Sequence, residues 1–327
     1  MSALLEIRDL HVEFRLRDRR IRAVDGLSYS VDSGRTLAVI GESGSGKTVS
    51  SRAVMGLLPE TASVSGSARF DGDELIGLPE ARLQEHRGAS IAMVFQDPSR
   101  SLNPTMRIGS QITEAIGAHL RVGGTAARER ALELLERVRL PSPKQRFDEY
   151  PHQLSGGMRQ RVGIAIALAP GPRLLIADEA TSSLDVTTQA QIMELLADLQ
   201  RDLGMALVMI SHDLGLAASF ADEVVVMYAG RAVEQAPTRK LFAQVRMPYT
   251  KALLAAIPRV ERPPHAELSV VPGRPPDLGA LPTGCPFHPR CPNAQELCRR
   301  SSPPFEEQEP NHRWACFFPY GNGGTPG

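Results

Sequence analysis

The stretch Gly41-Glu-Ser-Gly-Ser-Gly46-Lys47-Thr48 decides the fold of this chain. It follows the apolar run Thr36–Ile40, which is typical of a short buried strand, and it precedes residues 47–58, which have a helical pattern. A strand, a glycine-rich turn ending in Lys-Thr and a helix form the context that a phosphate-binding loop requires. The alternative is a glycine-rich turn with a chance lysine, and the complete match favours the phosphate-binding loop.

The residue types in this stretch suit phosphate. Glycine lets the backbone curl so that successive N–H groups point at phosphate oxygens, and the N-terminus of the following helix adds unpaired donors and a positive dipole end. Lys47 is expected to reach the β- and γ-phosphates, and the Thr48 hydroxyl to ligate Mg²⁺. The residues expected to contact ATP are Gly41, Glu42, Ser43, Gly44, Ser45, Gly46, Lys47, Thr48 and Val49.

Length and composition set the broad class. A chain of 327 residues predicts one large domain with an appendage, or two domains. The 37 basic and 37 acidic residues balance, which excludes the strong positive charge of a dedicated nucleic-acid-binding protein. A hydrophobic share of 42% supplies a core. Because no apolar run approaches the length of a membrane span and the N-terminus lacks the apolar part of a secretory signal, we expect a cytoplasmic protein.

The chain has two composition regimes. Up to residue 257, short β-rich runs alternate with helical stretches, which predicts an α/β fold with a mostly parallel sheet. Residues 258–327 hold 15 of the 26 prolines and all four cysteines, so this C-terminal tail is expected to be mostly loop. Strands are expected at 3–15, 22–32, 36–40, 91–95, 174–178, 206–211, 224–228 and 231–235, and helices at 47–58, 156–169, 187–203 and within 105–150.

An apolar run, Leu174–Asp178, ends in two carboxylates, those of Asp178 and Glu179. A buried parallel strand delivers its C-terminal residues to a ligand crevice. Asp178 is therefore a candidate Mg²⁺ partner, and Glu179 is a candidate base that orients and polarises the attacking water. The alternative is that both carboxylates are simply solvated at a strand end. The phosphate-binding loop upstream favours the catalytic interpretation over this one.

Residues 154–161 read Leu-Ser-Gly-Gly-Met-Arg-Gln-Arg and open a helix. Ser155 is a suitable N-cap, and Gly156 and Gly157 permit close approach of a backbone. The stretch is either a capped helix start or a second anion site at a helix N-terminus.

Together these motifs resemble the ATP-binding subunits of ABC transporters. In that family the residues at 154–158 form the signature, which binds the γ-phosphate of ATP held by the opposite subunit. Gln96 resembles the Q-loop glutamine and His212 the switch histidine. Phe14 falls where the family places the aromatic ring that stacks on adenine, although its alternation with preceding apolar residues also suits a core role. The resemblance assigns the signature to Leu154, Ser155, Gly156, Gly157 and Met158, and the D-loop to Ser183, Leu184 and Asp185.

The resemblance implies an ATPase that uses ATP and Mg²⁺. It implies an ABC-type P-loop core over residues 1–257, with an N-terminal antiparallel β subdomain and a helical insert at about 97–150 that leads into the signature helix. Two such subunits would sandwich two ATP molecules, and their closure would move a pair of membrane subunits. The implied catalytic residues are Glu179, His212 and Gln96, and the implied Mg²⁺ ligands are Thr48, Gln96 and Asp178.

A closer resemblance, to the oligopeptide and dipeptide importer ATPases, covers nearly the whole chain. It is carried by FQDPSRSLNPTMRIGSQI (95–112), LDVTTQAQI (184–192), PYTKALLAAIP (248–258) and VPGRPPDLGALPTGCPFHPRC (271–291). Met247 departs from the subgroup, which usually has His before Pro-Tyr-Thr. The resemblance implies import of peptides or similar small solutes. Import of nickel or another non-peptide solute is the alternative, and a soluble non-transport ABC ATPase is a more distant one.

The same resemblance implies partners and a location. The partners are a second ABC ATPase subunit, which we expect to be a paralogue in a heterodimer, two membrane permease subunits and, indirectly, an extracellular solute-binding protein. No nucleic acid is expected. The implied location is peripheral, at the cytoplasmic face of the cell membrane.

The cysteines of the tail have the spacing Cys285-x5-Cys291-x6-Cys298-x17-Cys316. In a reducing compartment such clustering indicates a metal rather than disulfides. The C-x2-C pair of ordinary zinc sites is missing, and two of the cysteines precede proline, as can occur at Fe–S ligands, so spacing alone leaves zinc and iron–sulfur open. The importer resemblance implies a [4Fe–4S] cluster, with Zn²⁺ as the runner-up and unligated thiols as the third alternative.

Overall fold

The computed structural model describes residues 3–16, 18–257 and 271–321. The chain forms two compact units: the first contains residues 1–31, 36–76 and 211–327, and the second contains 32–35 and 77–210. The expected domain boundary at 257/258 falls at the edge of residues 258–270, which lie outside the described residues.

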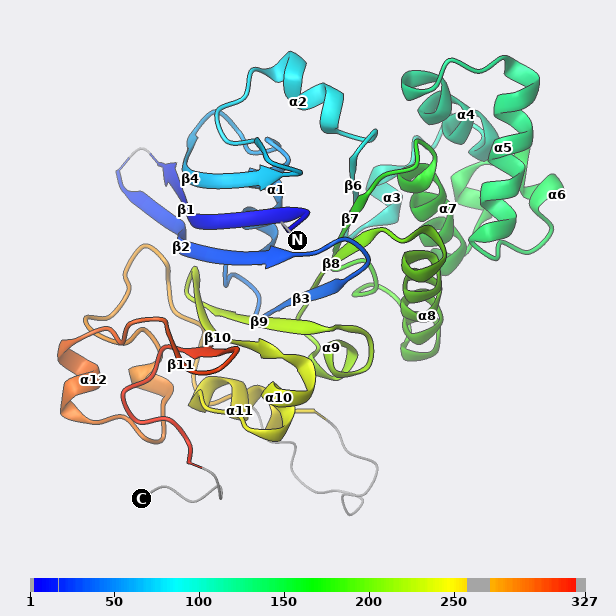
Figure 1. Ribbon diagram of the computed structural model, residues 1–327. Helices are drawn as coiled ribbons and strands as arrows, with labels where there is room; N and C mark the ends of the chain where they lie inside the picture. Colours follow the sequence, from blue (N-terminus) through cyan, green and yellow to red (C-terminus); the bar gives the residue numbers. More distant parts are fainter. Residues whose placement is uncertain (1–2, 17, 258–270, 322–327) are drawn as a thin grey trace. The chain divides into compact units, whose positions relative to one another are not determined.

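An antiparallel sheet forms the N-terminal part of the first unit, in the order β2-β1-β4-β5 (Figure 1). Leu10, Val12 and Val24 are fully buried, so one face of the sheet packs on a core while polar residues face outward. The expected antiparallel N-terminal subdomain is thereby confirmed. Its strands are β1 (Leu5–Arg15), β2 (Arg20–Val31), β4 (Ala62–Phe70) and β5 (Asp73–Glu74).

The first unit also contains five strands in the order β11-β12-β10-β9-β3. β3 (Thr36–Ile40) pairs in parallel with β9 (Glu223–Tyr228), and β10 (Arg231–Pro237) turns back on β9 in antiparallel register. Every residue of β3 is buried, as expected for a strand covered on both faces. The helices of this part are α1 (Lys47–Val54), α9 (Leu214–Phe220), α10 (Thr238–Ala243) and α11 (Pro248–Ala255).

Helix α1 is shorter than the sequence pattern predicts. It ends at Val54, whereas the apolar pattern continues to residue 58. Gly56 has φ of +61°, a left-handed conformation that stops a helix, and its N–H bonds back to the Ala53 carbonyl at 3.0 Å. The predicted helix end at residue 58 is therefore wrong. A glycine terminates α1 earlier, and hydrophobic periodicity gives no sign of such a C-cap.

The second unit contains three parallel strands in the order β8-β7-β6, which confirms the predicted α/β class. They are β6 (Ile91–Val94), β7 (Leu174–Asp178) and β8 (Ala206–Ser211). In α4, Ile108, Ile112 and Ile116 are buried at four-residue spacing and so form one apolar face within a group of helices (Figure 1). The helices are α2 (Glu80–His86), α3 (Pro98–Ser101), α4 (Ile108–His119), α5 (Gly124–Arg137), α6 (Pro143–Phe147), η1 (Pro151–Gln153), α7 (Gly156–Leu168) and α8 (Val186–Leu203).

Residues 271–321 of the C-terminal tail are mostly loop, as its prolines predict, yet they complete a sheet. β12 (His312–Trp314) pairs with β10, and β11 (Glu306–Glu309) pairs with β12. Two short helices precede these strands, η2 (His288–Arg290) and α12 (Glu296–Arg300). Backbone hydrogen bonds between β12 and β10 thus join the described tail to the rest of the first unit. The composition of the tail did not predict this pairing.

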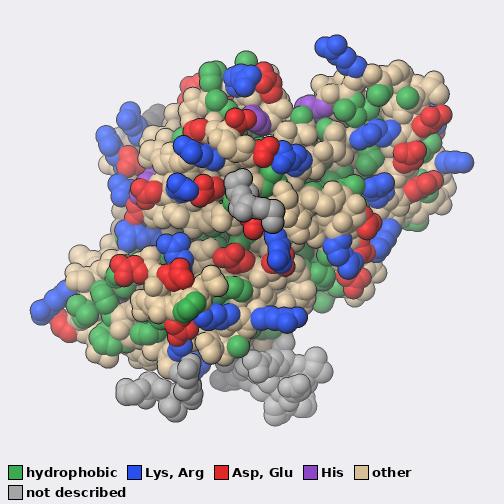
Figure 2. Space-filling model, viewed as in Figure 1, with side chains coloured by type: hydrophobic (Ala, Val, Ile, Leu, Met, Phe, Trp, Pro, Cys, Tyr) green, Lys and Arg blue, Asp and Glu red, His purple; other side chains and the backbone are tan. Residues whose placement is uncertain are grey.

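None of the helices in the part of the chain that the structure describes is long and apolar enough to span a bilayer. Figure 2 shows basic and acidic side chains interspersed over the visible face, in keeping with their equal numbers in the sequence.

Candidate nucleotide site

The phosphate-binding loop follows β3 and leads into α1, as the sequence predicts. At Gly41 a Cβ atom would lie 2.3 Å from the carbonyl oxygen of Met227, and at Gly46 it would lie 2.4 Å from that of Ala23. Gly46 also has φ of +99°. Backbone from neighbouring elements therefore crosses the loop so closely that only glycine fits at both positions.

Lys47 is folded against its own loop. Its side chain is almost completely buried, and Nζ donates hydrogen bonds to the carbonyl oxygens of Gly41 at 2.7 Å and Glu42 at 2.9 Å. The Ser45 carbonyl accepts from Gly230 N–H at 3.0 Å, which ties the loop to the β9–β10 turn. The ammonium thus lies at the centre of a curled backbone, where a point charge suited to phosphate is required.

The second unit brings two predicted catalytic residues into direct contact. Gln96 Nε2 donates to Glu179 Oε2 at 3.0 Å and to the Ser182 hydroxyl at 3.3 Å. Glu179 follows β7 directly and has φ of +48°, a conformation that non-glycine residues seldom adopt and that recurs at functional sites. Its N–H bonds to the Ile210 carbonyl of β8 at 3.0 Å, so the backbone at this strand end is fixed. Asp178, the last residue of β7, is buried.

The signature and the D-loop lie together in the second unit. Ser155 caps α7, since its hydroxyl accepts from Met158 N–H at 3.3 Å. A Cβ atom on Gly157 would lie 2.6 Å from Thr188 Cγ2 at the start of α8, so the two helix N-termini are in close contact. Asp185 caps α8 by accepting from Thr188 N–H at 3.0 Å, and this backbone hydrogen bond lowers the pKa of its carboxyl.

The remaining predicted ATP-site residues lie in the first unit. His212 is exposed and follows β8, immediately before Asp213, which caps α9 by accepting from Gly215 N–H at 2.7 Å. Phe14, near the end of β1, pairs with Ile21 and is half-buried. A half-buried ring is compatible with both roles considered for it, adenine stacking and packing. The phosphate-binding loop is also in this unit, whereas Gln96, Asp178, Glu179, the signature and the D-loop belong to the second.

The four cysteines line one small pocket of the first unit, and all four are free thiols. Burial raises the pKa of the Cys285 and Cys291 thiols and raises that of Cys316 to about 12. Within residues 3–16, 18–257 and 271–321, however, no three His, Cys, Asp or Glu side chains are grouped so that they could hold a metal ion. The four thiols are of the right chemical kind and line one pocket, but the expected [4Fe–4S] cluster is not supported by their arrangement.

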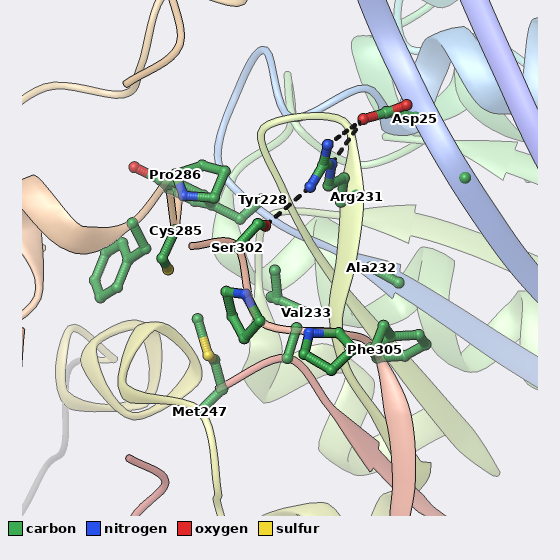
Figure 3. A pocket seen from close by; sticks show the side chains of 15 residues that line it. Asp25, Tyr228, Arg231, Ala232, Val233, Met247, Cys285, Pro286, Ser302 and Phe305 are labelled. Atoms are coloured by element: carbon green, nitrogen blue, oxygen red, sulfur yellow. Dashed lines mark hydrogen bonds and ion pairs between the residues drawn. The ribbon is translucent and has the colours of Figure 1, made fainter. Parts of the chain in front are cut away.

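A larger pocket, of about 380 Å³, lies beside Cys285 (Figure 3). The Arg231 guanidinium on one side donates to Asp25 at 2.7 Å and to the Ser302 hydroxyl at 3.0 Å. Burial by itself raises the pKa of the Asp25 carboxyl, but the hydrogen bonds and charges of Arg231 and Arg22 together outweigh burial, so the pKa lies below its ordinary value. Met247, the departure from the importer subgroup, lines both pockets and is buried.

Arg290 of the tail contacts the phosphate-binding loop, and sequence reasoning missed it. Arg290 pairs with Glu42 through both guanidinium nitrogens, at 2.6 and 2.9 Å. The signal available was only an arginine next to Cys291, and the two partners are separated by 248 positions. No local pattern reports a contact of that range.

The fold and these motifs place the chain in the class of ATP-binding cassettes. The sequence profile of the ABC transporter family matches residues 24–182, and the profile of the oligopeptide/dipeptide transporter C-terminal region matches residues 233–298. A solved structure described as the dimeric post-hydrolysis state of the ATP-binding cassette MJ0796, bound to ADP and Pi, superposes with a TM-score of 0.65. It is 27% identical, and the match covers 72% of this chain and 99% of that chain.

Similarity to full-length proteins is higher. The oligopeptide transport ATP-binding protein OppD of Salmonella typhimurium is 47% identical over 318 residues, which cover 97% of this chain and 94% of that protein. OppD of Bacillus subtilis is 46% identical over 314 residues, 95% of this chain and 88% of that protein. The chain therefore belongs to the family of oligopeptide ABC transporter ATP-binding subunits, which are ABC ATPases.

Proposed function

We propose that this chain hydrolyses ATP to power the import of peptides, as a nucleotide-binding subunit of an ABC importer. The observation that carries the proposal is the Gln96–Glu179 hydrogen bond at the end of β7, within a family of peptide-transport ATPases. A carboxylate held by an amide at a strand end suits a base that must keep one orientation. Lys47 and the loop N–H groups of residues 41–49 would bind the ATP phosphates.

Each remaining residue of the site has a role in this scheme. Glu179 accepts a proton from the attacking water, Gln96 orients that carboxylate, and His212 contacts the γ-phosphate. Mg²⁺ would neutralise charge on the β- and γ-phosphates, and its ligands would be the oxygens of Thr48, Gln96 and Asp178, which are of the hard type that Mg²⁺ prefers.

A second cassette would complete each nucleotide site. The signature serine Ser155 is exposed, and Val186, beside the D-loop residue Asp185, is 82% exposed although it is apolar. Because an exposed helix N-terminus suits phosphate and an exposed valine next to it suits a protein surface, this face of the second unit is the proposed contact with the other ATPase. We propose a paralogue there, in a heterodimer.

This scheme assigns a role to each of the two predicted domains. Residues 1–257 form the ATPase domain, in which the helical insert at about 97–150 leads into the signature helix, and residues 258–327 form the importer-type tail. The partners are two membrane permease subunits and, through them, an extracellular solute-binding protein. The chain would be peripheral at the cytoplasmic face of the membrane.

Reconstitution tests this function. The ATPase is co-purified from its native operon with its membrane partners, identified by mass spectrometry and placed in liposomes with the solute-binding protein. The proposal predicts ATP hydrolysis stimulated by oligopeptides and uptake of labelled peptide. Stimulation by nickel or another non-peptide solute alone would overturn the peptide assignment, and purification without permeases would indicate a soluble ATPase.

We further propose that Cys285, Cys291, Cys298 and Cys316 hold a [4Fe–4S] cluster, with Zn²⁺ as the runner-up. That all four cysteines line one pocket supports this, and the lack of a grouped ligand set among the described residues counts against it. Bound metal would order a loop-rich tail. Anaerobically purified protein is expected to be brown and to contain about four iron atoms per chain. Stoichiometric zinc would favour the runner-up, and metal-free protein would contradict both.

A further inference from the structure

An ion pair joins η2 of the tail to the phosphate-binding loop. Arg290 Nη1 lies 2.6 Å from Glu42 Oε2, and Nη2 lies 2.9 Å from Oε1. The Arg290 side chain is 5% exposed and that of Glu42 is 21% exposed. Such a nearly buried two-point pair fixes the orientation of both groups, and loss of one partner leaves the other charge without compensation.

The tail holds the Arg290 side chain independently of Glu42. Its Nε donates to the Pro272 carbonyl at 2.6 Å, and Nη2 donates to the Val271 carbonyl at 3.3 Å. The guanidinium also lies 5.9 Å from the Tyr228 ring centroid and 6.0 Å from that of Phe287. Because backbone and rings of the first unit set its position, Arg290 presents a preformed fork to the loop.

The carboxylate, the N–H and the carbonyl of Glu42 each make a hydrogen bond. Its carboxylate meets Arg290, its N–H donates to the Tyr249 hydroxyl at 2.9 Å, and its carbonyl accepts from Lys47 Nζ at 2.9 Å. Tyr249 in turn packs against Phe287 of the tail, with ring centroids 5.3 Å apart. The ammonium expected on the ATP phosphates thus contacts a residue that the tail holds directly through Arg290 and indirectly through Tyr249.

We propose that Arg290 is a positioning residue for ATP binding, which acts through Glu42 on the backbone of the phosphate-binding loop and on Lys47. This inference rests on the proposed binding of ATP by residues 41–49. The tail is then part of the nucleotide site, and any change that moves η2 changes the affinity of the loop for ATP. Pro275 and Pro276 line a small pocket with Glu42 and Ser45, so the tail lies beside the loop at a second place.

The test measures Mg²⁺-ATP binding to the full-length protein by titration calorimetry, together with the midpoint of thermal unfolding without nucleotide. Arg290→Gln is expected to raise the Kd for ATP about tenfold, within the usual range of coupling between sites. Glu42→Gln should raise it similarly, and the double variant should be no weaker than either single one, because both act through one pair. Arg290→Lys should recover part of the affinity.

Two matched variants separate positioning from general packing of the tail. Arg246→Gln removes the partly buried ion pair with Glu309, which fixes the tail away from the loop, and Arg300→Gln removes the exposed pair with Glu296. Arg246→Gln should lower the unfolding midpoint while its Kd for ATP stays near that of the wild type. Equal Kd values for Arg290→Gln and wild type, or an equal loss in Arg246→Gln, would overturn the proposal. If Lys47→Ala also bound ATP normally, the proposed function would fail first.

Discussion

Gln96 donates one hydrogen bond to Glu179 and a longer one to Ser182, so a single amide joins the carboxylate after β7 to the backbone turn that follows it. Glu179 already has a left-handed backbone, and Ser182 N–H bonds back to the Glu179 carbonyl at 3.1 Å. The carboxylate is therefore held from its backbone and from its side chain. A base fixed in this way needs little reorganisation when water attacks.

Replacing Gln96 tests this relationship. Gln96→Ala removes an amide that orients the Glu179 carboxylate, and misplacing a catalytic group commonly costs on the order of a hundredfold in rate. We expect kcat for ATP hydrolysis to fall by about that factor, while the Kd for ATP changes much less. Ser182→Ala is the matched control, since it removes only the longer bond of the same amide. Equal kcat values for Gln96→Ala and Ser182→Ala would show that the contact with Glu179 has no catalytic role.

Gly157 tests the packing of the signature against the D-loop helix. Gly157→Ala would place Cβ 2.6 Å from Thr188 Cγ2, and overpacking of this kind typically costs about 1–3 kcal/mol. The free energy of unfolding of Gly157→Ala should fall accordingly, and ATP hydrolysis with it. Adding Thr188→Ser removes the clashing methyl group and should restore most of both. Failure of the double variant to recover would mean that close contact is not the reason for glycine here.

Glu234 tests what holds the tail on the first unit. It is fully buried in β10, and its carboxylate accepts from His312 Nε2 at 2.9 Å, from Arg246 N–H at 2.7 Å and from Met247 N–H at 3.2 Å. Glu234→Ala leaves these groups without their acceptor and should destabilise the protein by about 3 kcal/mol in denaturant unfolding.

Protease digestion of the same variant should release the tail earlier than in the wild type. Glu306→Ala, on the exposed strand β11, is the control and should unfold like the wild type. A Glu234→Ala variant as stable as this control would show that the buried pair does not hold the tail.

Much of the secondary structure could be predicted because hydrophobic periodicity is a local signal in the sequence. Strands β3, β7 and β8 are formed by continuous apolar stretches of the sequence. The start of α7 could be predicted from Ser155, a residue type that commonly caps helices. β4 was missed because ASVSGSARF is rich in serine and glycine, which have low strand propensity. The strand conformation of β4 is set by its pairing with β1. The two strands approach so closely that a Cβ atom at Gly66 would lie 2.2 Å from the Asp9 carbonyl oxygen.

The candidate site divides in the same way. The phosphate-binding loop, the β7 carboxylates and the signature are contiguous motifs, so their residue types could be assigned from the sequence alone. The Arg290–Glu42 pair and the Glu234–His312 pair join residues far apart in the chain, and the fold alone brings them together. The three residues of β12 are too few for a periodic signal. β12 forms a strand because its backbone pairs with the edge of β10.

The most direct test of the account is ATP turnover by the reconstituted transporter carrying Glu179→Gln. The amide keeps the shape and the contact with Gln96 but cannot accept a proton from water, and general base catalysis commonly contributes at least about a hundredfold. We predict that kcat falls by that factor or more, that ATP binding is retained and that the ATPase dimer is trapped closed. Hydrolysis near the wild-type rate would contradict the assignment of Glu179 as the base.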